Sequence, residues 1–308
     1  MLRGSFVLEE TKCNICSSAR SKTLYKSGKP FQKEDKYLIT EVIPKIPQEI
    51  LRCLDCGLIY AKPERGPEEL ASFYINMADE EYKNEEVGRR ISAKNVLSKL
   101  RKFGKSSRLL DIGCATGFLL DEARKDGWEV HGVELSKWCV EYAKEKLGLD
   151  IFCGTLKNAP FGDSFFDAVI LNDVIEHLPD PKNTLIEIRR VLKKDGIVCI
   201  NTPDIDSLLS KMLKARWWGI NQAHLFYFTK ETLTKMLTSA GFVPIKFTRH
   251  PRTFSFNYWV ARFKNYSTLM YNVLKFLAEH TPLKTLHLTI NTADQIEVYA
   301  KIEPHTYG

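Results

Sequence analysis

A loop of small residues between a predicted strand and a predicted helix has the spacing of a ligand-binding site. Residues 111–117 read Asp-Ile-Gly-Cys-Ala-Thr-Gly, and small residues recur at every second position. Such a loop lets backbone amides approach a ligand closely. A dinucleotide-binding loop would require glycine at Phe118, which argues against a nicotinamide cofactor. Glu134 follows Asp111 by 23 residues, close to the ~20-residue spacing of ribose-binding acids, and its carboxylate can accept hydrogen bonds from two hydroxyls.

Four of the eight cysteines stand in two identical pairs with metal-binding spacing. Cys13 and Cys16 form one pair, Cys53 and Cys56 the other, and two residues separate the members of each pair. This gap lets both thiolates face one ion, and two pairs complete a tetrahedral zinc site with no open coordination position. We therefore expect residues 1–66 to form a small zinc-ribbon domain with a structural zinc. The alternative is two unrelated pairs, one of them redox-active.

The elements that must position the loop alternate in type along the chain. Residues 106–250 alternate apolar strand-like runs with amphipathic helical stretches, which predicts an α/β fold with helices on both faces of a parallel sheet. Ligands of such sheets bind at the carboxyl ends of the strands. Residues 67–105 are predicted to be a helical linker or lid, in which Tyr74 and Tyr82 either close over a ligand or serve packing.

An aromatic-rich insertion is predicted at about residues 251–290. Within it, Leu269, Met270, Val273, Leu274 and Leu277 recur at helical spacing. Packing of this helix on the core is the simplest interpretation. A substrate lid and a helix lying on a membrane surface are the alternatives.

The loop, the acid and the following strands together resemble the class I S-adenosylmethionine-dependent methyltransferases. The resemblance implies a Rossmann-like sheet of seven strands within a catalytic domain at residues 106–308, with S-adenosylmethionine as cofactor. In that family the first acid lies near the amino-acid part of the cofactor and the second binds the ribose. The resemblance also implies a set of cofactor-binding residues: Asp111, Gly113, Ala115, Gly117, Glu134, Thr155, Leu156 and Asn172.

Three of these residues carry specific expectations. Ala115 replaces the middle glycine of the family loop; alanine is small, but we do not expect it to take the positive φ open to glycine. Thr155 and Leu156 correspond to the stretch that wraps the adenine in the family. Core packing is the alternative role for Leu156.

Two histidines are the candidate catalytic bases. His177 lies in a segment that resembles the Glu-His-x-Pro-Asp-Pro stretch of small-molecule methyltransferases such as the ubiquinone O-methyltransferases, where acids and the histidine can hold a divalent cation. By that resemblance, Asp173, Glu176 and His177 are alternative cation ligands, and His177 can also simply fasten a loop. His224 begins a turn that resembles the family's His-x-x-x-Phe-[Ser/Thr] motif, whose histidine faces the substrate. A general base contributes ~10²–10⁴ to the rate when the nucleophile begins protonated.

A zinc ribbon ahead of such a domain resembles the arrangement in sugar methyltransferases. We therefore expect O- or C-methylation of a small-molecule acceptor, a sugar or glycan, in polysaccharide or secondary-metabolite biosynthesis. Methylation of RNA or protein, with the ribbon as recognition module, is the alternative, and a non-catalytic cofactor-binding regulator is the second alternative.

The composition and the net charge limit the kinds of partner that this protein is expected to bind. The 308 residues are 44% hydrophobic and carry a net charge of +7 without a dominant basic stripe, which argues against nucleic acid. No apolar run approaches the ~18 residues of a membrane span, and the first residues lack the apolar core of a signal peptide. We expect a cytoplasmic protein without a transmembrane segment, for which contact with a membrane surface stays open.

Overall fold

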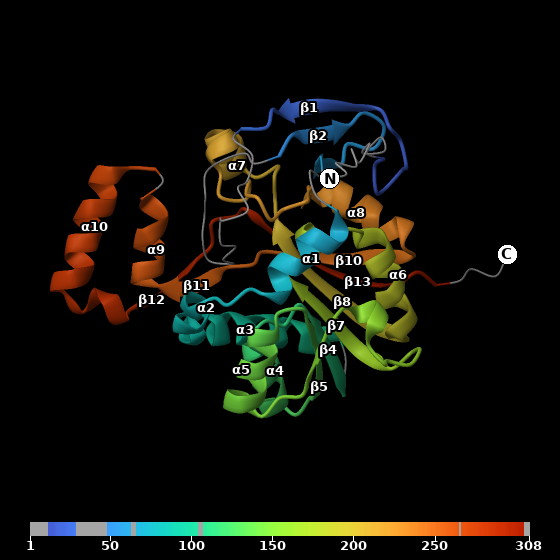
Figure 1. The fold of residues 1–308 in the computed structure, drawn as a ribbon. Helices are drawn as coiled ribbons and strands as arrows, with labels where there is room; N and C mark the ends of the chain where they lie inside the picture. Colours follow the sequence, from blue (N-terminus) through green and yellow to red (C-terminus); the bar gives the residue numbers. More distant parts are fainter. Residues whose placement is uncertain (1–11, 29–47, 63–65, 104–106, 265, 305–308) are drawn as a thin grey trace, which may run out of the picture.

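A sheet of seven strands forms the centre of the molecule (Figure 1). The computed structural model describes residues 12–28, 48–62, 66–103, 107–264 and 266–304. In spatial order the strands are β10 (Phe242–Thr248), β13 (Gln295–Ile302), β8 (Leu192–Pro203), β7 (Phe166–Asn172), β4 (Arg108–Ile112), β5 (Glu129–Glu134) and β6 (Ile151–Cys153). β6, β5, β4, β7 and β8 run parallel, whereas β13 is antiparallel to both of its neighbours. The predicted α/β sheet of seven strands is confirmed.

Helices cover both faces of the sheet because successive strand residues point to opposite sides. Leu110 and Leu109, both fully buried, belong to the two different core clusters. Leu110 faces α6 (Pro181–Val191) and α8 (Lys230–Ser239). Leu109 faces α3 (Glu86–Leu100), α4 (Phe118–Lys125) and α5 (Lys137–Leu147).

The cysteine-containing segment shares a second sheet with the catalytic part of the chain. Its order is β1 (Ser21–Tyr25), β2 (Ile50–Cys53), β3 (Ile59–Ala61) and β9 (Phe226–Tyr227), all antiparallel. β9 comes from the connection that follows β8, so the sheet continues past the expected domain boundary at residue 66. The Lys235 ammonium also donates to the carbonyl of Cys56 at 2.9 Å. The cysteine segment is therefore fastened to the central domain.

Among the described residues before the central sheet, three α-helices lie in the region where the sequence predicts a helical linker or lid. They are α1 (Pro67–Ile75), α2 (Glu80–Asn84) and α3. Pro67 opens α1 where its missing N–H costs nothing, and the carboxylate of Asp79 caps α2 by accepting from the Tyr82 amide. α3 packs closely against β11 (Arg252–Ser255): a Cβ on Gly88 would lie 2.3 Å from the carbonyl oxygen of Thr253. Glycine at this position permits the close approach.

The predicted insertion forms a helical hairpin on a two-stranded base. β11 pairs antiparallel with β12 (His287–Ile290), and between them lie α9 (Phe256–Phe263) and α10 (Thr268–His280). In Figure 1 these two helices project to the left, away from the central sheet. A further helix, α7 (Leu208–Leu213), follows β8. Across the described ranges, each helix is either too short or too polar to span a bilayer.

Candidate active site

The loop between β4 and α4 takes a left-handed backbone at each predicted small residue. Gly113, Ala115 and Gly117 have φ angles of +66°, +47° and +81°. The expectation that Ala115 would avoid a positive φ is wrong. Its amide donates to a carboxylate oxygen of Glu134 at 2.9 Å, and this contact holds the loop in place. A Cβ on Gly113 would lie 2.7 Å from Cγ2 of Val174, so that position requires glycine.

Asp111 and Glu134, at the ends of neighbouring strands, are both buried. The other oxygen of Glu134 accepts from the Ser136 amide at 2.8 Å. Burial raises the pKa of Glu134 despite these backbone hydrogen bonds. Burial also raises the pKa of Asp111 well above its usual value, and the charge of Glu134 adds to the effect. In the described part of the chain no basic side chain lowers the pKa of Asp111, so a cationic ligand would stabilise its carboxylate.

The same loop contains a buried hydroxyl without a hydrogen-bond partner among the described residues. Thr116 is fully buried, and its hydroxyl has no hydrogen-bond partner among the described residues. An unsatisfied buried hydroxyl costs about 1–3 kcal/mol. Asp111 lines the pocket, and a positively charged ligand with hydrogen-bonding groups would stabilise its carboxylate, so this loop fits S-adenosylmethionine.

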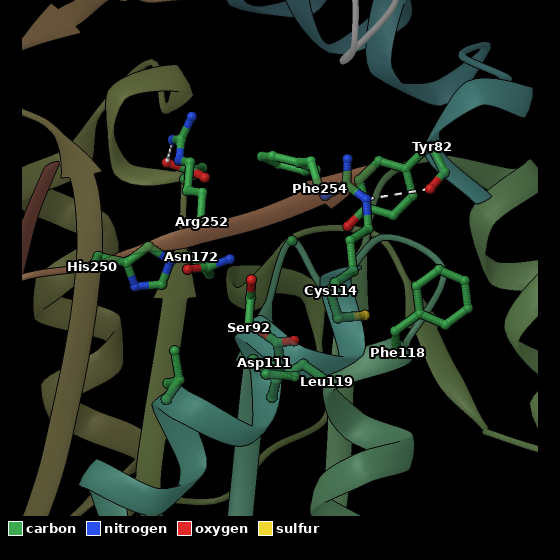
Figure 2. Close-up of a pocket in the computed structure, with 15 residues that line it drawn as sticks. Tyr82, Ser92, Asp111, Cys114, Phe118, Leu119, Asn172, His250, Arg252 and Phe254 are labelled. Atoms are coloured by element: carbon green, nitrogen blue, oxygen red, sulfur yellow. Dashed lines mark hydrogen bonds and ion pairs between the residues drawn. The ribbon is translucent and has the colours of Figure 1, made fainter. Parts of the chain in front are cut away.

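A pocket opens beside the loop at the carboxyl edge of the sheet (Figure 2). The loop and the end of β7 form its floor, while α2, α3 and β11 contribute its walls. Its lining residues are Tyr82, Arg89, Ser92, Ala93, Val96, Asp111, Gly113, Cys114, Phe118, Leu119, Asn172, Asp173, His250, Arg252 and Phe254. The helices before the sheet and the insertion after it therefore both enclose the site.

Two arginines in this pocket have different surroundings. The guanidinium of Arg89 lies 3.4 Å from the Tyr82 ring centroid, and its Nε donates to the Tyr82 carbonyl. Within the described ranges it pairs with no carboxylate. Arg252 donates to Asp173 at 2.7 Å. Sequence reasoning missed both arginines, because α3 and β11 are distant in the chain and no motif or spacing connects them.

The remaining predicted cofactor residues lie in three different environments. Asn172 lines the pocket, and its Oδ1 accepts from the Asn201 amide group at 3.2 Å. Thr155 is exposed just after β6. Leu156 is 4% exposed and belongs to the core cluster beneath α6, which fits the alternative packing role.

The two candidate bases lie together but do not line the pocket. The ring centroids of His177 and His224 are 4.7 Å apart and the rings are nearly perpendicular. Nδ1 of His177 is 2.9 Å from the Tyr74 hydroxyl and 3.1 Å from the Ala223 carbonyl oxygen. Nδ1 of His224 is 2.7 Å from the Gly219 carbonyl oxygen. Both imidazoles therefore hold the segment between β8 and β9 in place through its Gly219 and Ala223 carbonyls. Tyr74 of α1 contacts His177 of this pair.

Glu176 completes this histidine cluster. It is 1% exposed; one oxygen accepts from the Thr202 hydroxyl at 3.0 Å, and the other has no hydrogen-bond partner among the described residues. Burial and the nearby Asp173 raise the pKa of Glu176 to about 8, whereas burial lowers the pKa of His177 to about 4. The ligand atoms of Glu176, His177 and His224 lie within 4.8 Å of one another, the donor set of a divalent-cation site. Asp173, also expected in such a site, pairs instead with Arg252.

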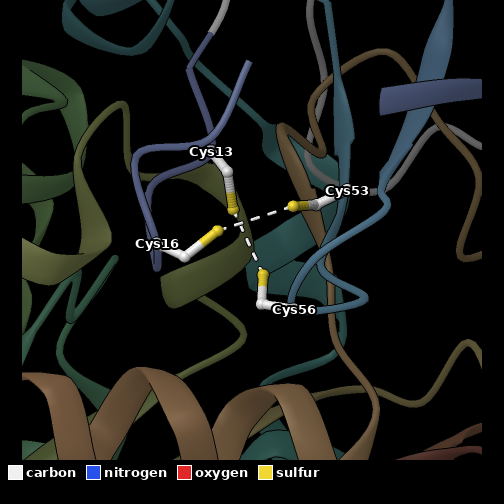
Figure 3. Close-up of side chains that lie close together, drawn as sticks. All are labelled: Cys13, Cys16, Cys53 and Cys56. Atoms are coloured by element: carbon white, nitrogen blue, oxygen red, sulfur yellow. Dashed lines mark hydrogen bonds between the residues drawn. The ribbon is translucent and has the colours of Figure 1, made fainter. Parts of the chain in front are cut away.

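The four paired cysteines converge on one point (Figure 3). The sulfur atoms of Cys13 and Cys56 are 3.3 Å apart, those of Cys16 and Cys53 are 3.5 Å apart, and all four lie within 4.8 Å of one another. None of the four forms a disulfide. Sulfur atoms about 2.3 Å from a common ion would lie ~3.8 Å apart, so the cluster fits a tetrahedral zinc.

Comparisons with known proteins agree with this fold. Residues 82–246, more than half of the chain, match a family described as a methyltransferase domain. A solved S-adenosylmethionine-dependent methyltransferase from Archaeoglobus fulgidus is similar with a TM-score of 0.50 at 20% identity, covering 72% of this chain and 100% of that chain.

Curated relatives are similar over about half of this chain. An uncharacterized protein of Methanocaldococcus jannaschii is 31% identical over 161 residues, which are 51% of this chain and 74% of that protein. A demethylmenaquinone methyltransferase of Lactococcus lactis is 30% identical over 172 residues, which are 46% of this chain and 68% of that protein. Two other relatives are matched over 43% and 30% of their lengths. The chain belongs to the methyltransferase-domain family and is a class I S-adenosylmethionine-dependent methyltransferase.

Proposed function

We propose that this enzyme methylates a sugar or glycan, at a hydroxyl oxygen or at a carbon beside a ketone. The observation that carries the proposal is the mixed lining of the pocket. The rings of Tyr82, Phe118 and Phe254 stand among the polar side chains of Ser92 and Asn172. A sugar presents C–H faces that pack on aromatic rings and hydroxyls that bond to such polar groups.

For the cofactor, we propose that Asp111 binds the ammonium group and Glu134 the ribose hydroxyls. Bound S-adenosylmethionine supplies a methyl group made electrophilic by the sulfonium. A carboxylate has about four acceptor positions, so Glu134 keeps capacity for the ribose after its two backbone hydrogen bonds. In this proposal Thr155 lies toward the adenine side and Asn172 toward the amino-acid side, while Leu156 supports Thr155 from the core.

We propose His177 as the base that removes the acceptor's proton, from an acceptor that extends past Asp173 at the edge of the pocket toward the cluster of Glu176, His177 and His224. The low pKa of His177 keeps the imidazole neutral, and 22% of its side chain is exposed. Because Nδ1 faces the Ala223 carbonyl and donates to it, the lone pair lies on Nε2. His224 is only 5% exposed and packs behind His177, so it acts by holding the first ring in place.

Arg89 favours an acceptor that carries phosphate. It lines the pocket, and in the described part of the chain it forms no ion pair with a carboxylate. A guanidinium binds phosphate oxygens through two parallel hydrogen bonds, so a nucleotide-linked sugar suits this pocket better than a neutral glycoside.

An acceptor screen tests the proposal. The purified enzyme would be incubated with labelled S-adenosylmethionine and nucleotide sugars, neutral glycosides, glycans, quinols or RNA, and mass spectrometry would locate the methyl group. We expect methylation of a nucleotide sugar. Arg89→Gln would raise its KM roughly tenfold, whereas the exposed-residue control Arg101→Gln would not. Methylation of RNA or quinol alone would refute the sugar proposal.

We propose that the cysteine cluster holds a structural zinc. No cysteine of the described residues forms a disulfide, which leaves all four thiolates of the cluster available to the ion. The pairing of β3 with β9 fastens this segment to the catalytic part, which favours a structural role over a free RNA- or protein-recognition module.

Metal analysis and a single substitution test the zinc. Elemental analysis of chelator-washed protein would find one zinc per chain. Cys53→Ser would lose the metal and lower the unfolding temperature, whereas Cys153→Ser, at an exposed cysteine outside the cluster, would keep it. Full stability without metal would contradict the assignment.

A further inference from the structure

One side of α10 exposes a continuous stripe of large apolar side chains. These five residues are between 38% and 77% exposed: Leu269, Met270, Val273, Phe276 and Leu277. At about 100° per residue they occupy an arc of roughly 120° on the helix. Single exposed apolar residues are ordinary, but a contiguous stripe on one helix marks a contact surface.

The stripe is not used in the packing of the hairpin itself. Ala278 is 4% exposed, and Tyr271 and Leu274 are partly buried on the same side of α10, where the helix meets α9. Asn272 and Lys275 occupy a third, polar side. The helix therefore has one side for α9, one for water and one apolar side that its own chain leaves exposed.

The hairpin is anchored beside the active-site pocket. Its base strand β11 contributes Arg252 and Phe254 to the pocket lining. Ser255, which caps α9, donates through its amide and its hydroxyl to the carboxylate of Glu85, at 2.7 and 2.6 Å. In Figure 1 the two helices extend from this base away from the rest of the molecule. The exposed stripe on α10 therefore belongs to a projecting part of the structure.

The charge of the hairpin indicates what it meets. Residues 256–290 carry one acidic residue, Glu279, against four basic ones, Arg262, Lys264, Lys275 and Lys284. Lys275 lies on the polar side of α10 and pairs with Glu279 at 3.8 Å, so the other three basic residues give the hairpin its net positive charge. Two such hairpins would repel each other, whereas anionic lipid headgroups attract a positively charged hairpin with an apolar surface. A helix of 13 residues is about 20 Å long, too short for a hydrocarbon core of ~30 Å, so it would lie in the interface.

We propose that the apolar stripe of α10 docks this enzyme on an anionic membrane surface. The apolar side chains enter the boundary between headgroups and acyl chains, and the net positive charge of the hairpin attracts it to anionic headgroups. This surface does not depend on the identity of the methyl acceptor.

Vesicle sedimentation of the full chain tests the docking directly. Vesicles of phosphatidylcholine alone would be compared with vesicles that also contain phosphatidylglycerol, at low and high salt. We expect the chain to sediment with the anionic vesicles, less so in high salt, and to stay in solution with phosphatidylcholine alone. The triple variant Leu269→Gln/Val273→Gln/Phe276→Gln would lower the partition coefficient by roughly a hundredfold.

A matched control uses exposed apolar residues on another helix. Leu208 and Met212 of α7 are 75% and 70% exposed, and Leu208→Gln/Met212→Gln would leave vesicle binding unchanged. Unaltered binding of S-adenosylhomocysteine would show that the triple variant is folded. The proposal fails if the unmodified chain ignores anionic vesicles or if the triple variant binds them equally well. It also fails if sedimentation velocity shows that the stripe forms a dimer of a chain that does not bind vesicles.

Discussion

Burial determines the protonation of the residues around the proposed base. Burial lowers the pKa of His177 to about 4, and burial together with Asp173 raises that of Glu176 to about 8. At neutral pH His177 is therefore an uncharged proton acceptor beside a largely protonated carboxyl. Tyr74 and the Ala223 carbonyl orient the imidazole, so the base needs no charged partner to hold its position.

Replacing this base would affect turnover and leave cofactor binding intact. His177→Gln would lower kcat by ~10²–10⁴ for an acceptor whose nucleophile begins protonated, with an unchanged Kd for S-adenosylmethionine. His280→Gln, at an exposed position of α10, serves as control. Steady-state kinetics and calorimetry measure the two quantities. Full turnover by His177→Gln would remove this residue from the mechanism.

The contact between α3 and β11 joins the helices before the sheet to the insertion after it. The carbonyl oxygen of Thr253 occupies the space that a side chain at residue 88 would need. The Thr253 amide also donates to the Ser92 hydroxyl at 3.2 Å. These contacts position Arg89 and Phe254 on neighbouring walls of the pocket.

A methyl group at this contact would separate the two elements. Gly88→Ala would destabilise the protein by about 1–3 kcal/mol, because backbone must move to admit the new Cβ. Gly162→Ala is the matched control, since a Cβ there meets nothing within 4 Å. Urea denaturation measures both changes. Equal stabilities of the two variants would show that the contact is looser than described.

Local patterns predicted the elements but not their long-range partners. The loop at 111–117 and the acid at Glu134 were predictable because their spacing reflects a strand, a turn and a helix in immediate succession. The pairing of β3 with β9 and the pocket arginines were not, because each joins segments with no shared periodicity. Ala115 shows a further limit: the carboxylate of Glu134 stabilises a backbone conformation that the residue type disfavours.

One buried acid connects distant parts of the whole molecule. Glu297 on β13 accepts from Lys99 of α3 at 2.8 Å and lies 2.7 Å from His250 Nδ1, beside the pocket. Burial opposes its ionisation, but the contacts with His250 and Lys99 outweigh that effect and lower the pKa of Glu297 to about 2. The charged form therefore stabilises the folded state.

This acid should make stability depend on pH below neutrality. Since the folded pKa is depressed, its contribution is fully present above the unfolded pKa near 4.5 and is lost as pH falls toward about 2. Glu297→Gln would lower the free energy of unfolding by about 3 kcal/mol at pH 7 and by progressively less below pH ~4.5. Urea unfolding across that range measures the difference. A difference that does not change with pH would contradict the assigned network.

Titration calorimetry with S-adenosylmethionine tests the central assignment most directly. We expect the unmodified chain to bind the cofactor, and Glu134→Gln to weaken binding by roughly 10- to 100-fold, because a charged acceptor for the ribose is lost. Glu129→Gln, at the exposed start of the same strand, would bind as the unmodified chain does. Absence of binding heat with the unmodified chain, or equal affinity for Glu134→Gln, would contradict the cofactor site described between β4 and β5.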